Sequence, residues 1–242
     1  VTDLADMDDS AAAGRRLGRS LAAPELVHVL VLGQGVQING STLIEGLAGS
    51  LGPDVMLSGG LAGDGGAFTR TWTLSRQGLS QRQIVAVGFS GEQLRVHSGS
   101  FHGWKPFGPL RKVTRCAGNV LYELDGIAAL DLYKRYLGDY AKDLPASGLL
   151  FPFEMLAEDR SALGLIRTIL GVDEATGSLV LAGNIVEDGY LRLMHASTDS
   201  LVDGATVAAQ AAWRAGADAD ESLVLLVSCV GRKLVMGARV DE

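Results

Sequence analysis

The sequence predicts an α+β fold of two related units, each a mixed, largely antiparallel sheet with covering helices. One arrangement compatible with this prediction stacks the helices and sheets as αββα layers. Apolar residues make up 47% of the 242 residues, which is enough for a sizeable core. Short apolar runs with strand character are separated by short connections, which favours pairing of neighbouring strands. A strand, a helix and a further strand follow one another in both halves of the chain.

The first elements are a helix, a strand, a second helix and a second strand. Residues 11–23 are good helix formers and predict a helix that Asp9 or Ser10 caps. The run Leu26–Gly33 hardly alternates, so we expect a strand buried on both faces. A short helix from about Ser41 ends at glycine, and the segment DVMLSGG predicts the next strand.

The remaining elements alternate between strand and helix patterns. Further strands are expected over residues 69–74, 83–90 and 94–101. Ile127, Leu130, Tyr133 and Leu137 then form one helical stripe, which Asp125 is placed to cap. The segment 145–156 breaks the pattern and is expected to cross between the units. The last part of the chain predicts strands at 165–173, 178–185, 190–197, 222–231 and 233–240, and a helix near 203–217.

Charge and composition limit the class of protein. A net charge of −7 and a pI near 5.1 argue against nucleic-acid binding. Neither a bilayer-spanning apolar run nor a signal peptide is visible, so we expect a cytoplasmic protein without membrane insertion. Cys116 and Cys229 are expected to be buried free thiols, with a disulfide or a nucleophile as alternatives.

The two ends of the sequence predict a fragment of a longer chain. Val1 is not a methionine, and the strand-like run KLVMGARV ends near Glu242 without a segment to cover it. An uncovered sheet edge favours association, so a homodimer is expected.

Most catalytic and cofactor motifs are missing. The segment GQGVQI has Ile38 where a dinucleotide-binding fingerprint requires its third glycine. The sequence also lacks a P-loop, a zinc-ligand spacing and the Gly-x-Ser-x-Gly of a hydrolase elbow.

Four histidines are candidates for ligands or core positions. His28 lies in a strand of valines and leucines and is expected in the core, and His97 on a strand face. His102 and Trp104 lie in the loop SFHGWKPFGP, which suits either a pocket rim or a core plug. His195 ends a strand. His102 and His195 are therefore the candidate metal or haem ligands.

A glycine-rich loop and one arginine are the candidate ligand-binding groups. The segment SGGLAGDGGAFTRTW contains Gly59, Gly60, Gly63 and Asp64. Asp64 either accepts hydrogen bonds from its own loop or binds the amine of a small ligand. Arg167 lies in an apolar stretch, where it either reaches the surface or is buried against a carboxylate. The carboxylate of an amino-acid ligand is one candidate for that partner.

The order of several segments resembles the FIST family. These segments are GGLAGD, HGWKPFGPLRKVTR, GNVLYELDGIAALDLYKRYLG and IRTILGVD with GSLVLAGNIVEDGYLRLM, and the resemblance runs from about residue 30 to 231. It implies an N-terminal FIST region over residues 1–101 and a C-terminal FIST region over residues 102–242. Full family members are longer at both ends.

The resemblance implies a sensory module of the kind found in bacterial signalling proteins and eukaryotic F-box proteins. Its expected ligand is a small molecule such as an amino acid, and its expected partner is a histidine kinase or another signalling protein. A haem-binding nitric oxide sensor is the alternative within the family, with His102 or His195 as axial ligand. A cysteine-dependent amidohydrolase with Cys116 as nucleophile is a further alternative, although no base is visible beside it, and we expect no enzyme.

Overall fold

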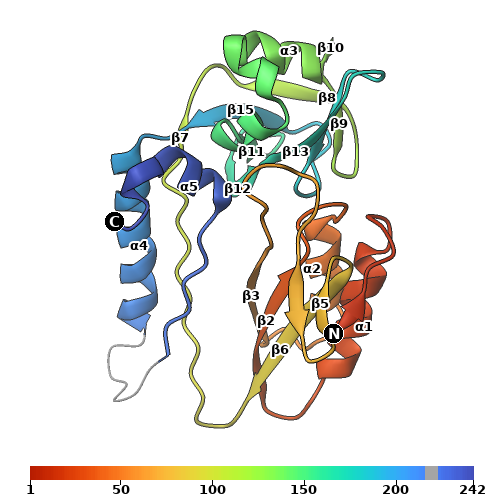
Figure 1. Ribbon diagram of the computed structural model, residues 1–242, viewed down its shortest axis with the longest axis vertical. Coiled ribbons are helices and arrows are strands. Elements are labelled where there is room, and N and C mark those ends of the chain that lie inside the picture. The colour runs from red at the N-terminus through yellow and green to blue at the C-terminus, as the bar shows by residue number, and fades with distance from the viewer. Residues whose placement is uncertain (216–222) are drawn as a thin grey trace.

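The computed structural model describes residues 1–215 and 223–242, which form a smaller N-terminal and a larger C-terminal unit (Figure 1). The first unit contains a four-stranded sheet and the second a nine-stranded sheet. Helix and strand contents are about 29% and 30%, and most strand pairs are antiparallel, so the predicted α+β class is confirmed.

The N-terminal unit has the strand order β1-β6-β2-β3. Strands β2 and β3 are parallel because a helix connects them, whereas β6 runs antiparallel to β2. Asn39 caps the connecting helix by accepting hydrogen bonds from the backbone of Ser41 and Thr42. The elements are β1 (Thr2–Asp3), α1 (Ser10–Leu21), β2 (Leu26–Gly33), α2 (Gly40–Ala48), β3 (Met56–Leu61) and β6 (Gln83–Ser90).

The two helices of this unit pack in close contact at glycines. A Cβ on Gly14 would lie 2.2 Å from the carbonyl oxygen of Leu43, and a Cβ on Gly46 would lie 2.2 Å from that of Ala11. Only glycine therefore permits this helix spacing. The helices cover one face of the sheet and bury Leu47 completely.

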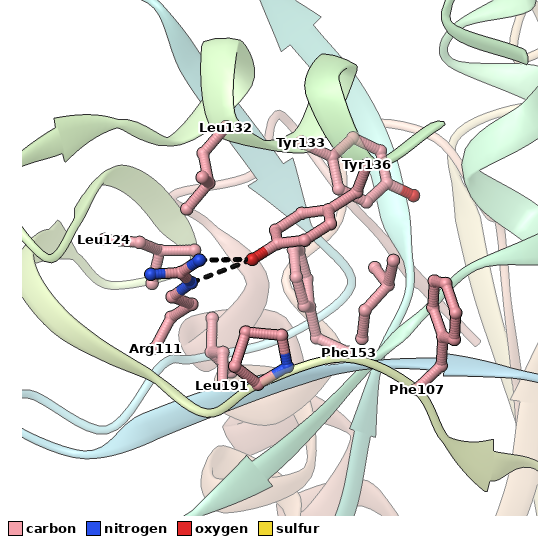
Figure 2. Close-up of a pocket in the computed structure, with 10 residues that line it drawn as sticks. Phe107, Arg111, Leu124, Leu132, Tyr133, Tyr136, Phe153 and Leu191 are labelled. Carbon is pink, nitrogen blue, oxygen red and sulfur yellow. Dashed lines mark hydrogen bonds between the residues drawn. The ribbon is translucent and has the colours of Figure 1, made fainter. Parts of the chain in front are cut away.

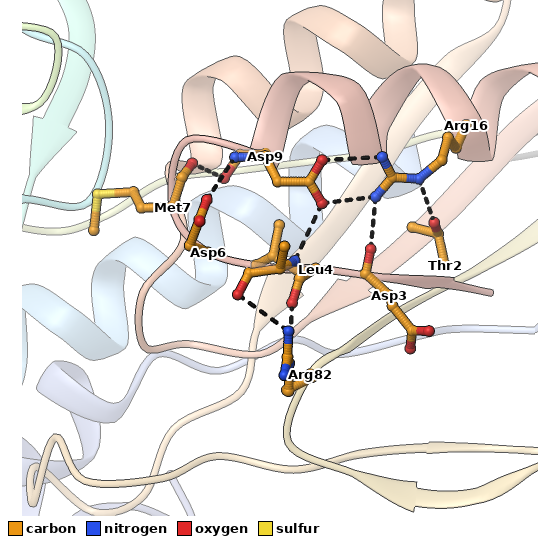
Figure 3. A network of polar contacts seen from close by, with 10 residues as sticks. Thr2, Asp3, Leu4, Asp6, Met7, Asp9, Arg16 and Arg82 are labelled. Carbon is orange, nitrogen blue, oxygen red and sulfur yellow. Dashed lines mark hydrogen bonds and ion pairs between the residues drawn. The ribbon is translucent and has the colours of Figure 1, made fainter.

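A polar network holds the N-terminal segment against α1 (Figure 3). Arg16 donates to Thr2 Oγ1, to the carbonyl oxygen of Asp3 and to the carboxylate of Asp9, whose Oδ2 lies 2.7 Å from Nη2. The hydrogen bond from Arg16 lowers the pKa of Asp9. Asp9 precedes the helix as predicted, but its side chain forms no capping bond because Arg16 and the Ala5 amide take its oxygens.

Two predictions for the rest of this unit need correction. Only β4 (Thr73–Ser75) forms in the segment 69–74, and it pairs with β5 (Gly78–Ser80) in a small hairpin. Residues 94–101 form no strand, and they belong to a long connection that runs from the lower to the upper unit in Figure 1. His97 is therefore not on a strand face.

The C-terminal unit has the strand order β12-β11-β15-β8-β9-β14-β13, with β7 paired to β15 and β10 paired to β9. All of these pairs are antiparallel. Its core includes Tyr133, whose hydroxyl donates to the carbonyl oxygen of Phe151 over 2.8 Å. The strands are β7 (Lys105–Pro106), β8 (Arg111–Ala117), β9 (Val120–Leu124), β10 (Ile127–Ala128), β11 (Phe153–Leu156), β12 (Ala162–Arg167), β13 (Ile169–Asp173), β14 (Ser178–Leu181) and β15 (Tyr190–His195).

The helices of this unit differ in part from the prediction. Asp125 and Gly126 have φ values of +52° and +74°, so they form the tight turn between β9 and β10 instead of capping a helix. The segment 145–156 forms a short helix and β11, so it lies within this unit and does not cross between units. The helices are α3 (Ala129–Leu137), η1 (Gly138–Asp143), η2 (Ala146–Leu150), α4 (Thr198–Ala215), α5 (Val230–Met236) and η3 (Gly237–Arg239).

The strands predicted near the C-terminus are wrong. Residues 223–229 pair with no strand, and α5 and η3 occupy residues 230–239. Residues 216–222, which include the start of the predicted strand and the end of the predicted helix 203–217, lie outside the described residues.

Candidate functional site

The carboxylate of Asp64 accepts hydrogen bonds from its own loop. It accepts hydrogen bonds from the amides of Phe68, Thr69 and Arg70 at 3.0, 2.9 and 3.2 Å. Burial acts to raise the pKa of Asp64, but these backbone donors outweigh it and lower the pKa. The loop-closing role foreseen for Asp64 is therefore the one that the geometry favours over binding of a ligand amine.

The glycines of this loop permit close approach of the backbone to neighbouring segments. A Cβ on Gly59 would lie 1.8 Å from the carbonyl oxygen of Val31. Gly60 faces Val227, and Gly63 faces Val230 at the start of α5. The glycine-rich loop of the first unit thus contacts the C-terminal helix directly.

The same loop reaches an open groove of about 290 Å³. A Cβ on Gly66 would lie 3.9 Å from both Ala146 and Leu234, which line the groove. The groove is bounded by η1, η2 and α5, and its lining residues are Tyr140, Asp143, Ala146, Ser147, Leu150 and Leu234. Its volume suits a small molecule.

Ser147, one of the lining residues, has a hydroxyl that is buried away from the open space of the groove. Ser147 is 5% exposed, and its Oγ has no hydrogen-bond partner in the described part of the chain. It is the one buried side-chain oxygen or nitrogen in residues 1–215 and 223–242 without a partner. An unpaired buried hydroxyl costs about 1–3 kcal/mol of folding stability.

The predicted arginine lies at the junction of the two units. Arg167 donates to the carbonyl oxygens of Asn184 and Ile166 at 2.8 and 3.2 Å and to Ser41 Oγ at 3.4 Å. Burial lowers its pKa. Within the residues that the structure describes, no acidic side chain pairs with Arg167, and no hydrogen bond joins it to Asp64.

The start of α2 completes this junction. The Gly40 amide donates to the carbonyl oxygen of Ala182, and the Asn39 side chain donates to Asn184 Oδ1 over 2.8 Å. Because Asn39 accepts from the next two helix amides, the amides at the start of α2 are not free for a ligand carboxylate. We therefore call the set Asn39, Ser41, Arg167 and Asn184 the inter-unit latch; ligand binding by Arg167 stays a prediction.

Trp104 and His102 both contact α5: Trp104 packs in a cluster with Met236, and Arg232 donates to the carbonyl oxygen of His102. Trp104 is 8% exposed and packs in a cluster with Met194, Leu201 and Met236, so the core-plug interpretation fits it best. His102 Nδ1 accepts a hydrogen bond from the Trp104 amide at 3.0 Å, and burial lowers the pKa of His102.

This hydrogen bond is unfavourable for haem ligation by His102. A neutral imidazole whose Nδ1 accepts carries its proton on Nε2, which then has no lone pair for iron. Ligating histidines normally donate through the second ring nitrogen instead. His195 is exposed and packs edge-on against Phe107 at 5.8 Å. Haem binding stays a prediction without support from either residue.

His28 occupies the predicted core position. It is 6% exposed, its Nε2 lies 2.7 Å from Ser58 Oγ, and its ring stacks on Phe89. In residues 1–215 and 223–242, no group of three or more histidine, cysteine and acidic side chains is arranged to hold a metal ion. No helix of the described chain is both long and apolar enough to cross a bilayer.

The cysteines are free but not equally buried. Cys116 lies in β8 and is half-buried, and burial raises the pKa of its thiol, which disfavours the thiolate that a nucleophile needs. Cys229 is exposed, so its predicted burial is wrong.

A second cavity lies between α3 and the nine-stranded sheet and is too small for an organic ligand (Figure 2). Its volume of about 10 Å³ holds a single water at most. Arg111 donates to the Tyr136 hydroxyl at its edge over 2.9 and 2.6 Å. The groove at Ser147 is therefore the better candidate, and its residues Tyr140, Asp143 and Ser147 were not singled out by the sequence.

Comparison with known proteins places the chain in a family. The FIST N domain family matches residues 1–127, and the FIST C domain family matches residues 129–242. The uncharacterized protein MJ1623 of Methanocaldococcus jannaschii is 24% identical over 200 residues, which cover 78% of this chain and 38% of that protein. The match thus spans less than half of that relative, and no solved structure matches the chain. With both domain matches together, the chain belongs to the FIST family of sensory, signal-transduction domains.

Proposed function

We propose that this chain senses a small ligand in the groove formed by η1, η2 and α5, and passes the bound state to a signalling partner. The observation that carries this proposal is the open groove of about 290 Å³ itself, which η1, η2 and α5 line and which the glycine-rich loop of the first unit approaches at Gly66. Amino acids are the first class to screen, as the resemblance implies.

The response is proposed to run through α5. Leu234 on this helix lines the groove, and Met236 on the same helix packs in a cluster with Trp104. Val230 at its first turn contacts Gly63 of the first unit. A ligand that shifts α5 therefore acts on both units, and it favours whichever arrangement binds it more tightly.

The partner is proposed to be a histidine kinase or another signalling protein of the cytoplasm, without nucleic acid or membrane insertion. The acidic charge of −7 supports the exclusion of nucleic acid. Three further points are also proposals. The chain forms a homodimer, its two FIST regions divide between residues 101 and 102, and, as the alternative function, it binds haem through His102 or His195. An absorption spectrum after addition of hemin tests the last of these directly.

The test of the groove is a thermal-shift screen of amino acids and simple metabolites against the whole chain. Leu234→Arg places a charged side chain in the groove and is expected to abolish the stabilisation that a bound ligand produces. Leu79→Arg, at a leucine that is 69% exposed on β5, is the matched control and should leave it unchanged. A ligand that stabilises Leu234→Arg as strongly as the unaltered chain would place the binding site elsewhere.

A further inference from the structure

An extended apolar segment runs beside the first sheet without joining it. Residues 223–228 form neither helix nor strand, and no hydrogen bond links their backbone to any residue that the structure describes. Figure 1 shows this segment as a blue coil that leads up to α5 on the β3 side of α4. Its apolar side chains are 54–89% exposed, and they are Leu223, Val224, Leu225, Leu226 and Val227. Exposure of five adjacent apolar side chains to water is unfavourable, so a conformation that covers them is favoured.

The edge of the first sheet beside this segment is open. β3 is the last strand of the order β1-β6-β2-β3, so it pairs with β2 on one side and with no described strand on the other. The unpaired N–H and C=O groups of such an edge can accept a further strand. Three neighbouring residues of β3 are small, Ser58, Gly59 and Gly60, and they leave room for the larger side chains of an added strand.

Two contacts fix how the segment is aligned with β3. A Cβ on Gly60 would lie 3.2 Å from Cγ1 of Val227, and a Cβ on Gly63 would lie 3.5 Å from Cβ of Val230. Both pairs are 167 residues apart in sequence (60 to 227 and 63 to 230), so the segment and β3 run in the same direction. The same spacing sets Ser58 beside residue 225.

We propose that residues 223–228 add to the free edge of β3 as a fifth, parallel strand of the first sheet. The structure then describes the undocked state of a strap (residues 223–228) whose C-terminal end already contacts β3. Docking pairs the strap with the open backbone edge and covers its apolar side chains. It also fixes the approach to α5, which starts at Val230 and lines the groove.

The side chains of the docked strap fit both faces of the sheet, because successive residues of a strand point to opposite faces. Leu225 lies beside Ser58, on the face of His28, since Ser58 Oγ is 2.7 Å from His28 Nε2. Val224 lies beside Leu57, which packs against the core under α1 and α2. Neither β3 nor the strap contains a charged residue, so docking covers no charge on either strand.

Amide hydrogen exchange of the whole chain tests the docking. Alternate amides of the strap should bond to β3 and exchange at least about tenfold more slowly than in an unstructured chain. Because only alternate amides face β3, one of Leu225→Pro and Leu226→Pro removes a bonded amide and should abolish this protection, and the other is its matched control. Neither residue is hydrogen-bonded in the undocked state, so both variants leave that state intact.

A cysteine pair tests the alignment. In a chain whose Cys116 and Cys229 are replaced by serine, Ser58→Cys with Leu225→Cys places the two Cα atoms about 5 Å apart in the docked strap, within the range for a disulfide. Ser58→Cys with Leu226→Cys is the matched control, because position 226 points to the opposite face. In a glutathione buffer, the first pair should form its disulfide at least about tenfold faster than the control pair.

The outcomes are decisive for the strap and independent of any ligand. Unprotected strap amides in the unaltered chain, or protection that neither proline variant removes, would show that the strap does not dock on β3. Equal rates of cross-linking for the two cysteine pairs would overturn the parallel alignment. Neither measurement uses a ligand of the groove, so the sensory proposal is decided separately by its thermal-shift screen.

Discussion

Removal of the Ser147 hydroxyl is expected to stabilise the ligand-free protein. The side chain is 5% exposed and its Oγ has no partner in the described chain, so folding takes this hydroxyl out of water without compensation. That loss is about 1–3 kcal/mol, and the small void left by one oxygen atom offsets part of the gain in Ser147→Ala. We expect a net increase in the free energy of unfolding of about 1 kcal/mol, which raises the Tm by roughly 2–4 °C for a chain of this size.

The control is Ser10, a buried serine whose hydroxyl does have hydrogen-bond partners. Ser10 is 0% exposed, its Oγ donates to the carbonyl oxygen of Met7 at 2.6 Å, and it accepts from the Asn39 amide at 3.0 Å. Ser10→Ala should therefore lower the free energy of unfolding by about 1–2 kcal/mol in urea denaturation. If Ser147→Ala is destabilising to the same extent as Ser10→Ala, the Ser147 hydroxyl has a hydrogen-bond partner in solution and its lack of a partner is refuted.

Three further predictions concern the latch, pH and the thiols. Arg167→Met removes the donors of the latch and should cost about 1–3 kcal/mol in urea denaturation; an unchanged midpoint would mean that the latch does not hold the units together. Burial lowers the pKa of His28 and of His102 from the ordinary 6.5, so the unfolded chain binds more protons than the folded chain below pH 6.5. The Tm should therefore fall on acidification from pH 7.5 to 5.5. These two histidines should leave the Tm unchanged between pH 7.5 and 8.5. With a thiol reagent at neutral pH, the exposed Cys229 should react first and the half-buried Cys116 slowly; the reverse order would revive Cys116 as a nucleophile.

Much of the fold was predictable from local pattern. The strand Leu26–Gly33 matches its prediction at both ends, because its apolar run and the glycine that follows are local signals. The segment 94–101 has an equally strand-like pattern, yet it pairs with no strand. A strand depends on hydrogen bonds to a partner, and periodicity does not specify that partner. The same holds for residues 223–229, where Leu226 is 89% exposed.

The candidate site was only partly predictable for a similar reason. The glycine-rich loop was noticed from its composition, and the structure brings Gly66 of that loop to the groove. Ser147 lies in a segment with no motif, and what distinguishes it is the lack of a partner once it is buried. That property arises from tertiary packing and leaves no mark in the spacing of residues. Asp64, in contrast, was a strong local signal for a turn. Its carboxylate accepts hydrogen bonds from the amides of that turn and is therefore not free to bind a ligand.

The position of β15 in the nine-stranded sheet has a consequence for folding during synthesis. All strands of the first sheet have been synthesised once β6 ends at Ser90. The second sheet needs β15 as the partner of β8, and β15 ends at His195, which is 105 residues after Ser90. At about 5–20 residues per second, a ribosome needs roughly 5–20 s to cover that distance. During this interval the first unit can fold, while the β8–β9 hairpin presents an open edge to other nascent chains. A translational pause before β15 should therefore favour aggregation, and one after it should not.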